Sequence, residues 1–135
     1  MKTLKIFTDG GARNNPGPAG IGVVVKDIEN NVIETYKKYI GDKTNNQAEY
    51  EALIYALEKV SGKGDVLECF LDSQLVVNQA TGAYKVKNAE IRELLFKVKT
   101  LEQDFNEVHY FHIPREQNKE ADKLVNEALD EYLSS

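Results

Sequence analysis

Apolar side chains recur along the chain with two different periods. Recurrence at every second position over short runs is typical of strands, and recurrence at every third or fourth position over longer runs is typical of helices. The expected strands are residues 3–8, 21–26, 32–40, 66–71 and 108–113. The expected helices are residues 45–61, a short helix over 73–81, one that Asn88 opens and one that Asn118 opens. This order predicts an α/β fold, with one mixed sheet and helices on both of its faces.

Two of the expected strands end in an aspartate. Asp9 follows the first strand and precedes Gly10 and Gly11, and Asp72 follows the fourth. The Gly, Asn and Pro residues after Asp9 predict that the first strand stops there. Because ligands bind at the carboxyl ends of parallel strands, a βα connection would place Asp72 beside Asp9 at such an edge. Each aspartate also has a plain alternative, since Asp-Gly is common in turns and Asp72 or Ser73 would serve as a helix N-cap.

The helix over residues 45–61 has a well-marked start and an acid on its apolar face. Thr44 and Gln47 fit a capping box. The apolar stripe includes Leu53, and a step of four residues back from Leu53 leads to Glu49. A charged side chain on this face is costly unless it is paired or coordinated. The alternative is a half-solvated carboxylate favoured by the helix dipole, and the pattern alone leaves both interpretations open.

A fourth acid, Asp122, lies in the first turn of the last expected helix. This helix has an apolar stripe on one face, and Asn118 before it is a suitable N-cap. Asp122 borders the stripe, so we expect it to point toward the carboxyl edge of the sheet. The alternative is again electrostatic, because the helix dipole favours an aspartate in any first turn.

Length and composition indicate one domain over residues 1–135. Hydrophobic residues make up 41% and charged residues 29%, as in globular chains. The one cysteine, Cys69, excludes an intrachain disulfide, which fits a reducing compartment. We find no apolar leader and no run of ~18 apolar residues. We therefore expect a cytoplasmic monomer with no membrane partner.

The net charge of −5 at first argues against a nucleic-acid partner, because phosphate binding normally uses a positive surface. Two divalent cations carry four positive charges and would reduce the net charge to −1. Basic side chains also cluster before and along the helix after Asn88, where they form either a solvated face or a surface that holds phosphates. They are Lys85, Lys87, Arg92, Lys97 and Lys99.

The four acids together point to a metal centre. Four carboxylates within a few Å of one another cannot all be ionised without a counter-charge. Oxygen ligands suit Mg²⁺ or Mn²⁺, whereas one cysteine and two histidines make a zinc site improbable. We expect two Mg²⁺ or Mn²⁺ ions, since a pair ~3.5–4 Å apart catalyses in-line phosphoryl displacement.

Five segments in order resemble successive motifs of type 1 ribonuclease H and span nearly the whole chain. They are residues 8–11, 15–20, 44–49, 71–74 and 118–122. The resemblance implies a ribonuclease H-like fold with a five-stranded sheet in the order 3-2-1-4-5. It also implies a metal-dependent endonuclease that hydrolyses the RNA strand of RNA/DNA hybrids and leaves 5′-phosphate and 3′-hydroxyl ends.

The resemblance also implies a role for each matching residue. The acids that would bind the metal ions are Asp9, Glu49, Asp72 and Asp122. Residues that would touch the minor groove of the hybrid are Asn15, Asn45, Asn46 and Gln74, and Thr44 would contact a DNA phosphate. Backbone groups that would contact 2′-hydroxyls belong to Gly10, Gly11, Ala12 and Arg13. Such contacts distinguish RNA from DNA by shape rather than sequence.

Two features depart from the family's common pattern. The loop over residues 114–118 is short and contains Arg115 but no histidine, and we carry no catalytic role over to His112. Arg115 would either act in catalysis, through phosphate contact or product release, or be an ordinary surface arginine. The second departure is that a basic protrusion is missing, and we expect no separate hybrid-binding domain. Affinity would then be weak, or selectivity loose enough to admit double-stranded RNA.

Two other functions stay open. The first is a catalytically silent nucleic-acid-binding domain of the same fold, although binding alone gains nothing from clustered negative charge. The second is a resolvase, a transposase-like nuclease or an exonuclease, which would explain residues 44–47 and 72–74 less well.

Overall fold

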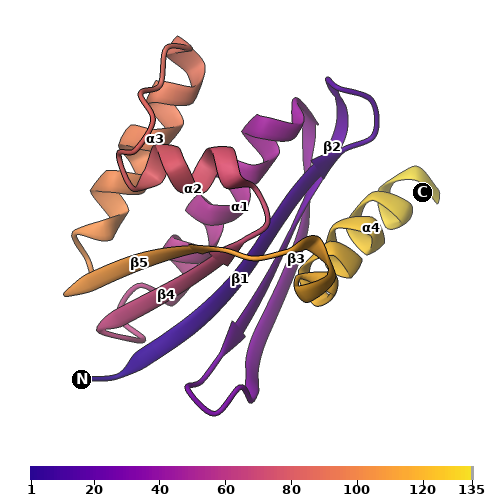
Figure 1. The fold of residues 1–135 in the computed structure, drawn as a ribbon. Coiled ribbons are helices and arrows are strands. Elements are labelled where there is room, and N and C mark those ends of the chain that lie inside the picture. The colour runs from indigo at the N-terminus through magenta and orange to yellow at the C-terminus, as the bar shows by residue number, and fades with distance from the viewer. Residues whose placement is uncertain (135) are drawn as a thin grey trace.

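In the computed structural model, which describes residues 1–134, five strands form one sheet flanked by helices (Figure 1). The strands are β1 (Thr3–Ala12), β2 (Gly17–Lys26), β3 (Val32–Lys43), β4 (Val66–Leu71) and β5 (Glu107–His112). The helices are α1 (Asn45–Val60), α2 (Gln74–Ala80), α3 (Ala89–Glu102) and α4 (Lys119–Ser134), with a 3₁₀ turn at Arg115–Gln117. The sheet order is β3-β2-β1-β4-β5, which confirms the predicted fold.

The first three strands pair antiparallel, and β1, β4 and β5 pair parallel. Helices α1 and α4 cover opposite faces of this sheet. On β2, Gly22 lies against α4 whereas the next residue, Val23, belongs to the core under α1. Successive residues of a strand point to opposite faces, so the two helices sandwich the sheet. Figure 1 shows α4 apart from the group formed by α1, α2 and α3.

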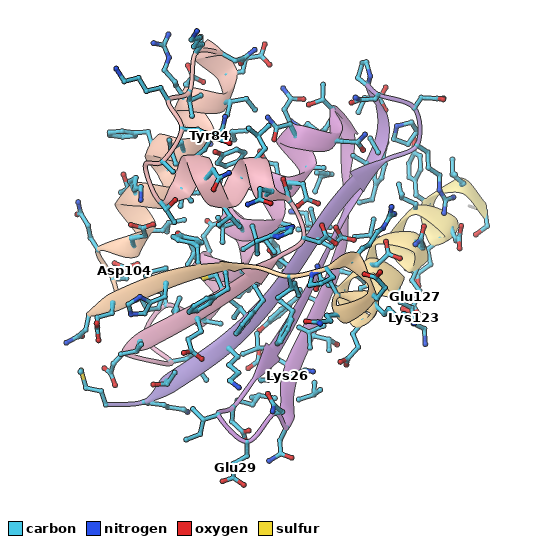
Figure 2. All side chains as sticks on the ribbon, viewed as in Figure 1. Lys26, Glu29, Tyr84, Asp104, Lys123 and Glu127 are labelled. Carbon is cyan, nitrogen blue, oxygen red and sulfur yellow. The ribbon has the colours of Figure 1, made fainter. Side chains whose placement is uncertain are left out.

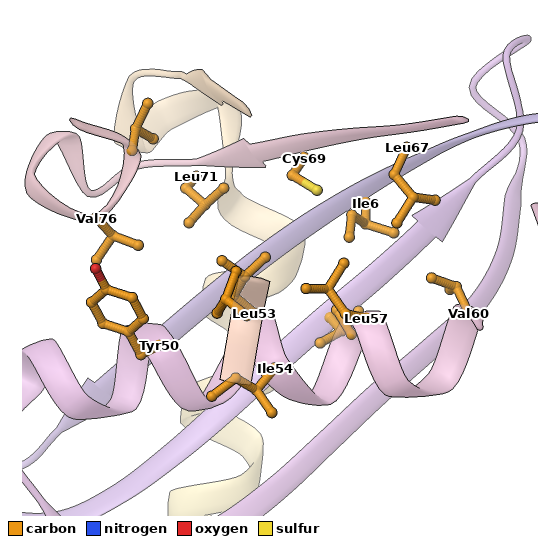
Figure 3. Close-up of a cluster of buried hydrophobic side chains, with 14 of the residues drawn as sticks. Ile6, Tyr50, Leu53, Ile54, Leu57, Val60, Leu67, Cys69, Leu71 and Val76 are labelled. Carbon is orange, nitrogen blue, oxygen red and sulfur yellow. The ribbon is translucent and has the colours of Figure 1, made fainter. Parts of the chain in front are cut away.

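The main core lies between the sheet and α1 and α3. Figure 3 shows the part of it between α1 and the sheet. The predicted apolar stripe of α1 is fully buried in it, including Leu53 and Leu57. Ile6 of β1 and Cys69 of β4 face this helix from adjacent strands. Burial raises the pKa of the Cys69 thiol, so the cysteine packs here as a small apolar side chain.

Strand β1 extends further than predicted. It pairs with β4 only as far as Thr8, but its antiparallel pairing with β2 continues to Ala12. A Cβ atom on Gly10 would lie 2.1 Å from the carbonyl oxygen of Ala48, so glycine allows α1 to approach the strand this closely. The prediction that the strand stops just after Asp9 is therefore wrong, because the glycine packs under a helix. Strand β2 also starts earlier than predicted, at Gly17, and its residues 19–21 pair with this extension of β1.

The ends of the helices confirm most of the predicted caps. Thr44 and Gln47 form both hydrogen bonds of the capping box, and Ser73 rather than Asp72 caps α2. Asn88 caps α3, as predicted. Asn118 immediately precedes α4, as predicted, but its side-chain oxygen makes no capping hydrogen bond among the described residues. Its amide nitrogen donates to Thr8 of β1 and to Asp72, which follows β4. No helix within residues 1–134 is long and apolar enough to cross a lipid bilayer.

Helix α4 lies close to β2 at Gly22. A Cβ atom at this position would lie 2.2 Å from the carbonyl oxygen of Ala121, so the helix backbone rests directly on the strand. Ion pairs also join α4 to the sheet. Lys26 contacts Glu120 at 2.9 Å, and Glu127 contacts Lys37 at 3.7 Å. Exposed ion pairs contribute little stability, so the close packing at Gly22 sets the position of α4.

We predict that Gly22→Ala destabilises the protein by about 1–3 kcal/mol, the usual cost of forcing an extra methyl group into a packed interface. Thermal unfolding in EDTA measures this change. Gly11→Ala is the matched control, because its Cβ atom would lie at an ordinary 3.7 Å from Val125. Equal melting temperatures for the wild type and Gly22→Ala would show that α4 does not depend on this contact.

Candidate active site

Three of the predicted acids converge at the carboxyl edge of the sheet. Asp9 lies on β1, Glu49 on the first turns of α1, and Asp72 directly after β4. One carboxylate oxygen from each lies within 4.8 Å of the others. The parallel pairing of Thr8 with Leu71 brings the two aspartates together, as the βα argument predicts. Helix α1 packs closely on Gly10, and this contact brings Glu49 to the two aspartates from the face of the sheet that α1 covers.

Glu49 is buried, with 7% of its surface exposed, and only one of its two oxygens is hydrogen-bonded. Oε1 accepts a hydrogen bond of 2.8 Å from the backbone N–H of Gly10. Oε2 is buried and has no partner among the described residues. Because Glu49 is buried, the half-solvated alternative does not apply. A buried acceptor without a partner is costly, so Oε2 is open to a ligand.

The electrostatics of the cluster disfavour full ionisation. Burial is the main reason why the pKa of Asp9 rises from 3.8 to about 7, and the neighbouring Glu49 carboxyl group partly offsets this rise. The charges of Asp72 and Asp122 raise the pKa of Asp9 further. Burial, followed by the charge of Asp9, raises the pKa of Glu49 well above its usual range. The acids therefore fit a site that gains a positive counter-charge.

Asp122 joins the cluster from α4. Gly22, which faces α4, is paired with Asp9, and cross-strand partners point to the same face of a sheet. Asp9 and Asp122 are therefore close enough for the charge of Asp122 to raise the pKa of Asp9. The guanidinium of Arg115 lies 4.0 Å from the Asp122 carboxylate, and its side chain is 83% exposed. Arg115 thus lies at the edge of the acid cluster, where its exposed guanidinium can contact an anion in the solvent.

The acids line a cleft of about 600 Å³, which we call the acidic cleft. Its walls bring together all four acids, Arg115 and the predicted backbone segment. They comprise Asp9, Gly10, Gly11, Ala12, Arg13, Asn45, Glu49, Asp72, Ser73, Arg115, Asp122, Val125, Asn126 and Leu129. Four of the predicted hybrid contacts do not line it: Asn15, Thr44, Asn46 and Gln74.

The polar residues at one end of the cleft hold its loops together. The side-chain oxygen of Asn45 accepts from the N–H of Ala12 at 2.9 Å, and that of Asn15 accepts from the N–H of Asn45 at 2.9 Å. The Thr44 hydroxyl accepts from the N–H of Gln47 as a helix cap. Gln74 is exposed at the first position of α2. Asn45 and Asn15 thus fix backbone that forms the cleft wall, whereas the hydroxyl of Thr44 is used as a helix cap and Gln74 is exposed outside the wall.

One wall of the cleft was missed by the sequence analysis. Val125, Asn126 and Leu129 of α4 lie three, four and seven residues after Asp122 and line the cleft with it. Helical spacing from Asp122 would have found them, because such positions share one face. Also unforeseen is the ion pair of 2.7 Å between Arg13 and Asp130. It holds the Arg13 guanidinium against α4 in the cleft wall.

Comparison with protein families and curated proteins gives consistent matches. Residues 7–128 match the reverse transcriptase-like family. The chain is 41% identical to ribonuclease HI of Halobacterium salinarum, over 93% of this chain and 63% of that protein. A bifunctional protein of Mycobacterium tuberculosis is 41% identical over the whole chain, which spans only 37% of that relative. Ribonuclease H of Methylococcus capsulatus is 32% identical, over 98% of this chain and 93% of its own.

Solved structures show the same relationship. LC11-RNase H1 in complex with an RNA/DNA hybrid matches with a TM-score of 0.92 and 47% identity, over 96% of this chain and 99% of that chain. RNase H1 of Halobacterium salinarum matches with a TM-score of 0.93 and 40% identity, over 96% and 98% of the two chains. The family match over residues 7–128, and a ribonuclease H that this chain covers over 93% of its length at 32% identity, show that the chain belongs to the type 1 ribonuclease H family.

Proposed function

We propose that this protein is a metal-dependent endonuclease that hydrolyses the RNA strand of RNA/DNA hybrids. One observation carries the proposal: three carboxylates converge within 4.8 Å in an open cleft, and the buried Oε2 of Glu49 has no partner among the described residues. In a domain that only binds nucleic acid, nothing would compensate the cost of clustering these buried carboxylates. The hybrid is proposed as substrate because LC11-RNase H1, 47% identical, was solved in complex with one.

Asp9, Glu49, Asp72 and Asp122 would hold two Mg²⁺ or Mn²⁺ ions. The donor set fits, since it consists of carboxylate oxygens and the described part of the cleft wall has neither cysteine nor histidine. Bound divalent cations would supply Lewis acidity and charge neutralisation at the scissile phosphate. The Gly10 N–H holds Oε1 of Glu49, which fixes the carboxylate and leaves Oε2 for the cation.

The proposed reaction is an in-line displacement by water at phosphorus. The water oxygen forms a new P–O bond while the bond between phosphorus and the 3′-oxygen breaks. One proton of the water leaves, and the departing 3′-oxygen takes up a proton, so the products are a 5′-phosphate and a 3′-hydroxyl. Around this step the chain's own groups would orient the RNA strand, chiefly the backbone of Gly10, Gly11, Ala12 and Arg13.

Recognition of the hybrid would combine the cleft wall with the polar residues that surround it. Side-chain amides suit the minor groove, where 2′-hydroxyls and base edges are displayed. We assign such contacts to Asn15, Asn45, Asn46 and Gln74, and a DNA phosphate contact to Thr44. Arg115, exposed at the rim beside Asp122, would contact a phosphate of the RNA strand. A guanidinium suits this role because its donors match phosphate oxygens.

The remaining expectations are proposals of the same kind. All four acids come from one chain, so we propose that a monomer over one domain is sufficient for activity. Shape-based recognition through 2′-hydroxyls would also admit double-stranded RNA at a lower rate. A single buried thiol suits a protein that works in the cytoplasm.

The central prediction is that Asp72→Asn abolishes cleavage. Purified protein is incubated with end-labelled RNA/DNA hybrid, RNA duplex, DNA duplex and single strands, with Mg²⁺, with Mn²⁺ and with EDTA. Internal cleavage of the hybrid should require metal and disappear in Asp72→Asn, because that substitution removes one metal-binding carboxylate. Asp104→Asn, distant from the cleft beside α3, is the matched control and should cleave like the wild type (Figure 2). Hybrid binding without cleavage under either metal would establish a silent domain instead.

A second prediction concerns stability without metal. In EDTA, Asp9→Asn should be at least as stable as the wild type, because it relieves repulsion among the acids. The folded state holds a proton on Asp9 up to pH about 7, whereas the unfolded chain releases it near 3.8. The contribution of Asp9 to the wild-type free energy of unfolding therefore falls as the pH rises through this window.

Asparagine does not titrate, so the advantage of Asp9→Asn should grow between pH 4 and pH 7 and reach at least about 1 kcal/mol. Denaturant unfolding of both proteins in EDTA at several pH values measures this difference. A variant that loses several kcal/mol at every pH would make Asp9 a structural residue and contradict the repulsion argument.

A third prediction tests Arg115. Arg115→Ala should lower turnover on the hybrid about tenfold, the effect of roughly 1.4 kcal/mol in a barrier, while the metal requirement stays. Lys123→Ala removes the same charge from the exposed side of α4 and serves as the control (Figure 2). Steady-state kinetics with both variants distinguish a catalytic role of Arg115 from that of an ordinary surface arginine. If Arg115→Ala and Lys123→Ala behave alike, Arg115 is an ordinary surface arginine.

A further inference from the structure

Asn118, the residue before α4, has an unusual environment. Its surface is 1% exposed, yet it lies in a short loop whose neighbours on both sides are exposed. Its side-chain nitrogen donates to the carbonyl oxygen of Thr8 at 2.9 Å and to Oδ2 of Asp72 at 3.3 Å. One amide group therefore joins the loop after β5 to β1 and to the residue that follows β4.

The orientation of this amide is fixed by its partners. A backbone carbonyl such as that of Thr8 offers only an acceptor oxygen, so the group that faces it has to be the NH₂ donor. A flipped amide would place its oxygen against two other oxygens. The donor beside Asp72 also adds a positive partial charge where the carboxylates repel one another. It occupies Oδ2 of Asp72, and Oδ1 is left as the oxygen without a hydrogen bond among the described residues.

Each contact of Asn118 supports a different acid. Thr8 immediately precedes Asp9 on β1, and Asp72 is contacted directly. The backbone carbonyl of Asn118 accepts from the N–H of Asp122 at 3.1 Å in the first turn of α4. Asn118 is thus connected to three of the four acids, although it is not part of the cleft wall.

We infer that Asn118 is a positioning residue, which sets the Asp72 carboxylate and the first turn of α4 at a fixed separation from Asp9. The inference rests on the proposed metal-dependent function. A purely structural role explains the site less well, because the Asn118 side-chain oxygen is buried and has no partner among the described residues. A helix cap would use that oxygen as an acceptor, and an apolar side chain would fill the space without leaving it unsatisfied.

The test compares Asn118→Ala with Gln117→Ala, because Gln117 is a neighbouring exposed residue whose side chain makes no hydrogen bond or ion pair to the acids among the described residues. Titration calorimetry measures Mn²⁺ binding to the metal-free proteins, and steady-state kinetics give kcat and KM for the hybrid. Loss of a residue that orients a metal ligand costs roughly 10–100-fold in metal affinity or activity. We expect such a loss of Mn²⁺ affinity and of kcat in Asn118→Ala, with KM for the hybrid unchanged, and neither effect in Gln117→Ala.

Equal Mn²⁺ affinities for the wild type and a folded Asn118→Ala would overturn the inference, as would a change confined to the melting temperature. Asn118→Ser, which leaves a smaller void, repeats the test if the alanine variant does not fold. Failure of both to fold would make Asn118 a folding residue and overturn the inference too. A wild type that binds Mn²⁺ but leaves hybrids intact would refute the proposed function alone, because the comparison of affinities still tests Asn118.

Discussion

Repulsion among carboxylates gathered at one sheet edge is the constraint on which the rest of this structure depends. Burial and mutual repulsion raise the pKa values of Asp9 and Glu49, so the metal-free cluster is unfavourable when it is ionised. The fold prevents the acids from moving apart. Helix α1 packs on Gly10 and helix α4 on Gly22, and a single methyl group at either position would collide with a helix backbone. Stability in the hydrophobic core thus maintains a cluster of carboxylates whose repulsion is relieved by protonation or by a bound cation.

The position of the site between two layers explains how so small a chain forms it. Glu49 approaches from the face under α1, and Asp122 from the face under α4. Between them, Asp9 and Asp72 directly follow the last residues that β1 and β4 pair with each other. The carboxyl edge of the sheet, where α1 and α4 begin, forms the acidic cleft. Positive groups around the opening are few. Arg115 is exposed at the rim, whereas Arg13 is paired with Asp130. Hybrid affinity would consequently depend on bound cations more than on the protein surface.

Hydrophobic periods and caps in the sequence predict the helices and strands. The order of the strands in the sheet is predicted only by the family resemblance. Glu49 is found by stepping back along an apolar stripe, and Asp72 by the rule that parallel strands share an edge. The extension of β1 could not be foreseen, because a glycine after an aspartate is typical of a turn and is also found in a strand under a closely packed helix. Asn118 was misjudged for a related reason. An asparagine before a helix is a typical cap, and only its spatial neighbours Thr8 and Asp72 show that the amide nitrogen is in use.

Anomalous diffraction from crystals of the wild-type protein grown with Mn²⁺ tests the central claim most directly, because it locates the cation without relying on activity. The account predicts Mn²⁺ peaks in the acidic cleft within bonding distance of Asp9, Glu49 and Asp72, with Oε2 of Glu49 among the ligands. Two peaks would support the paired-ion mechanism. Mn²⁺ bound only elsewhere on the protein, with Oε2 of Glu49 still unpartnered, would contradict the account.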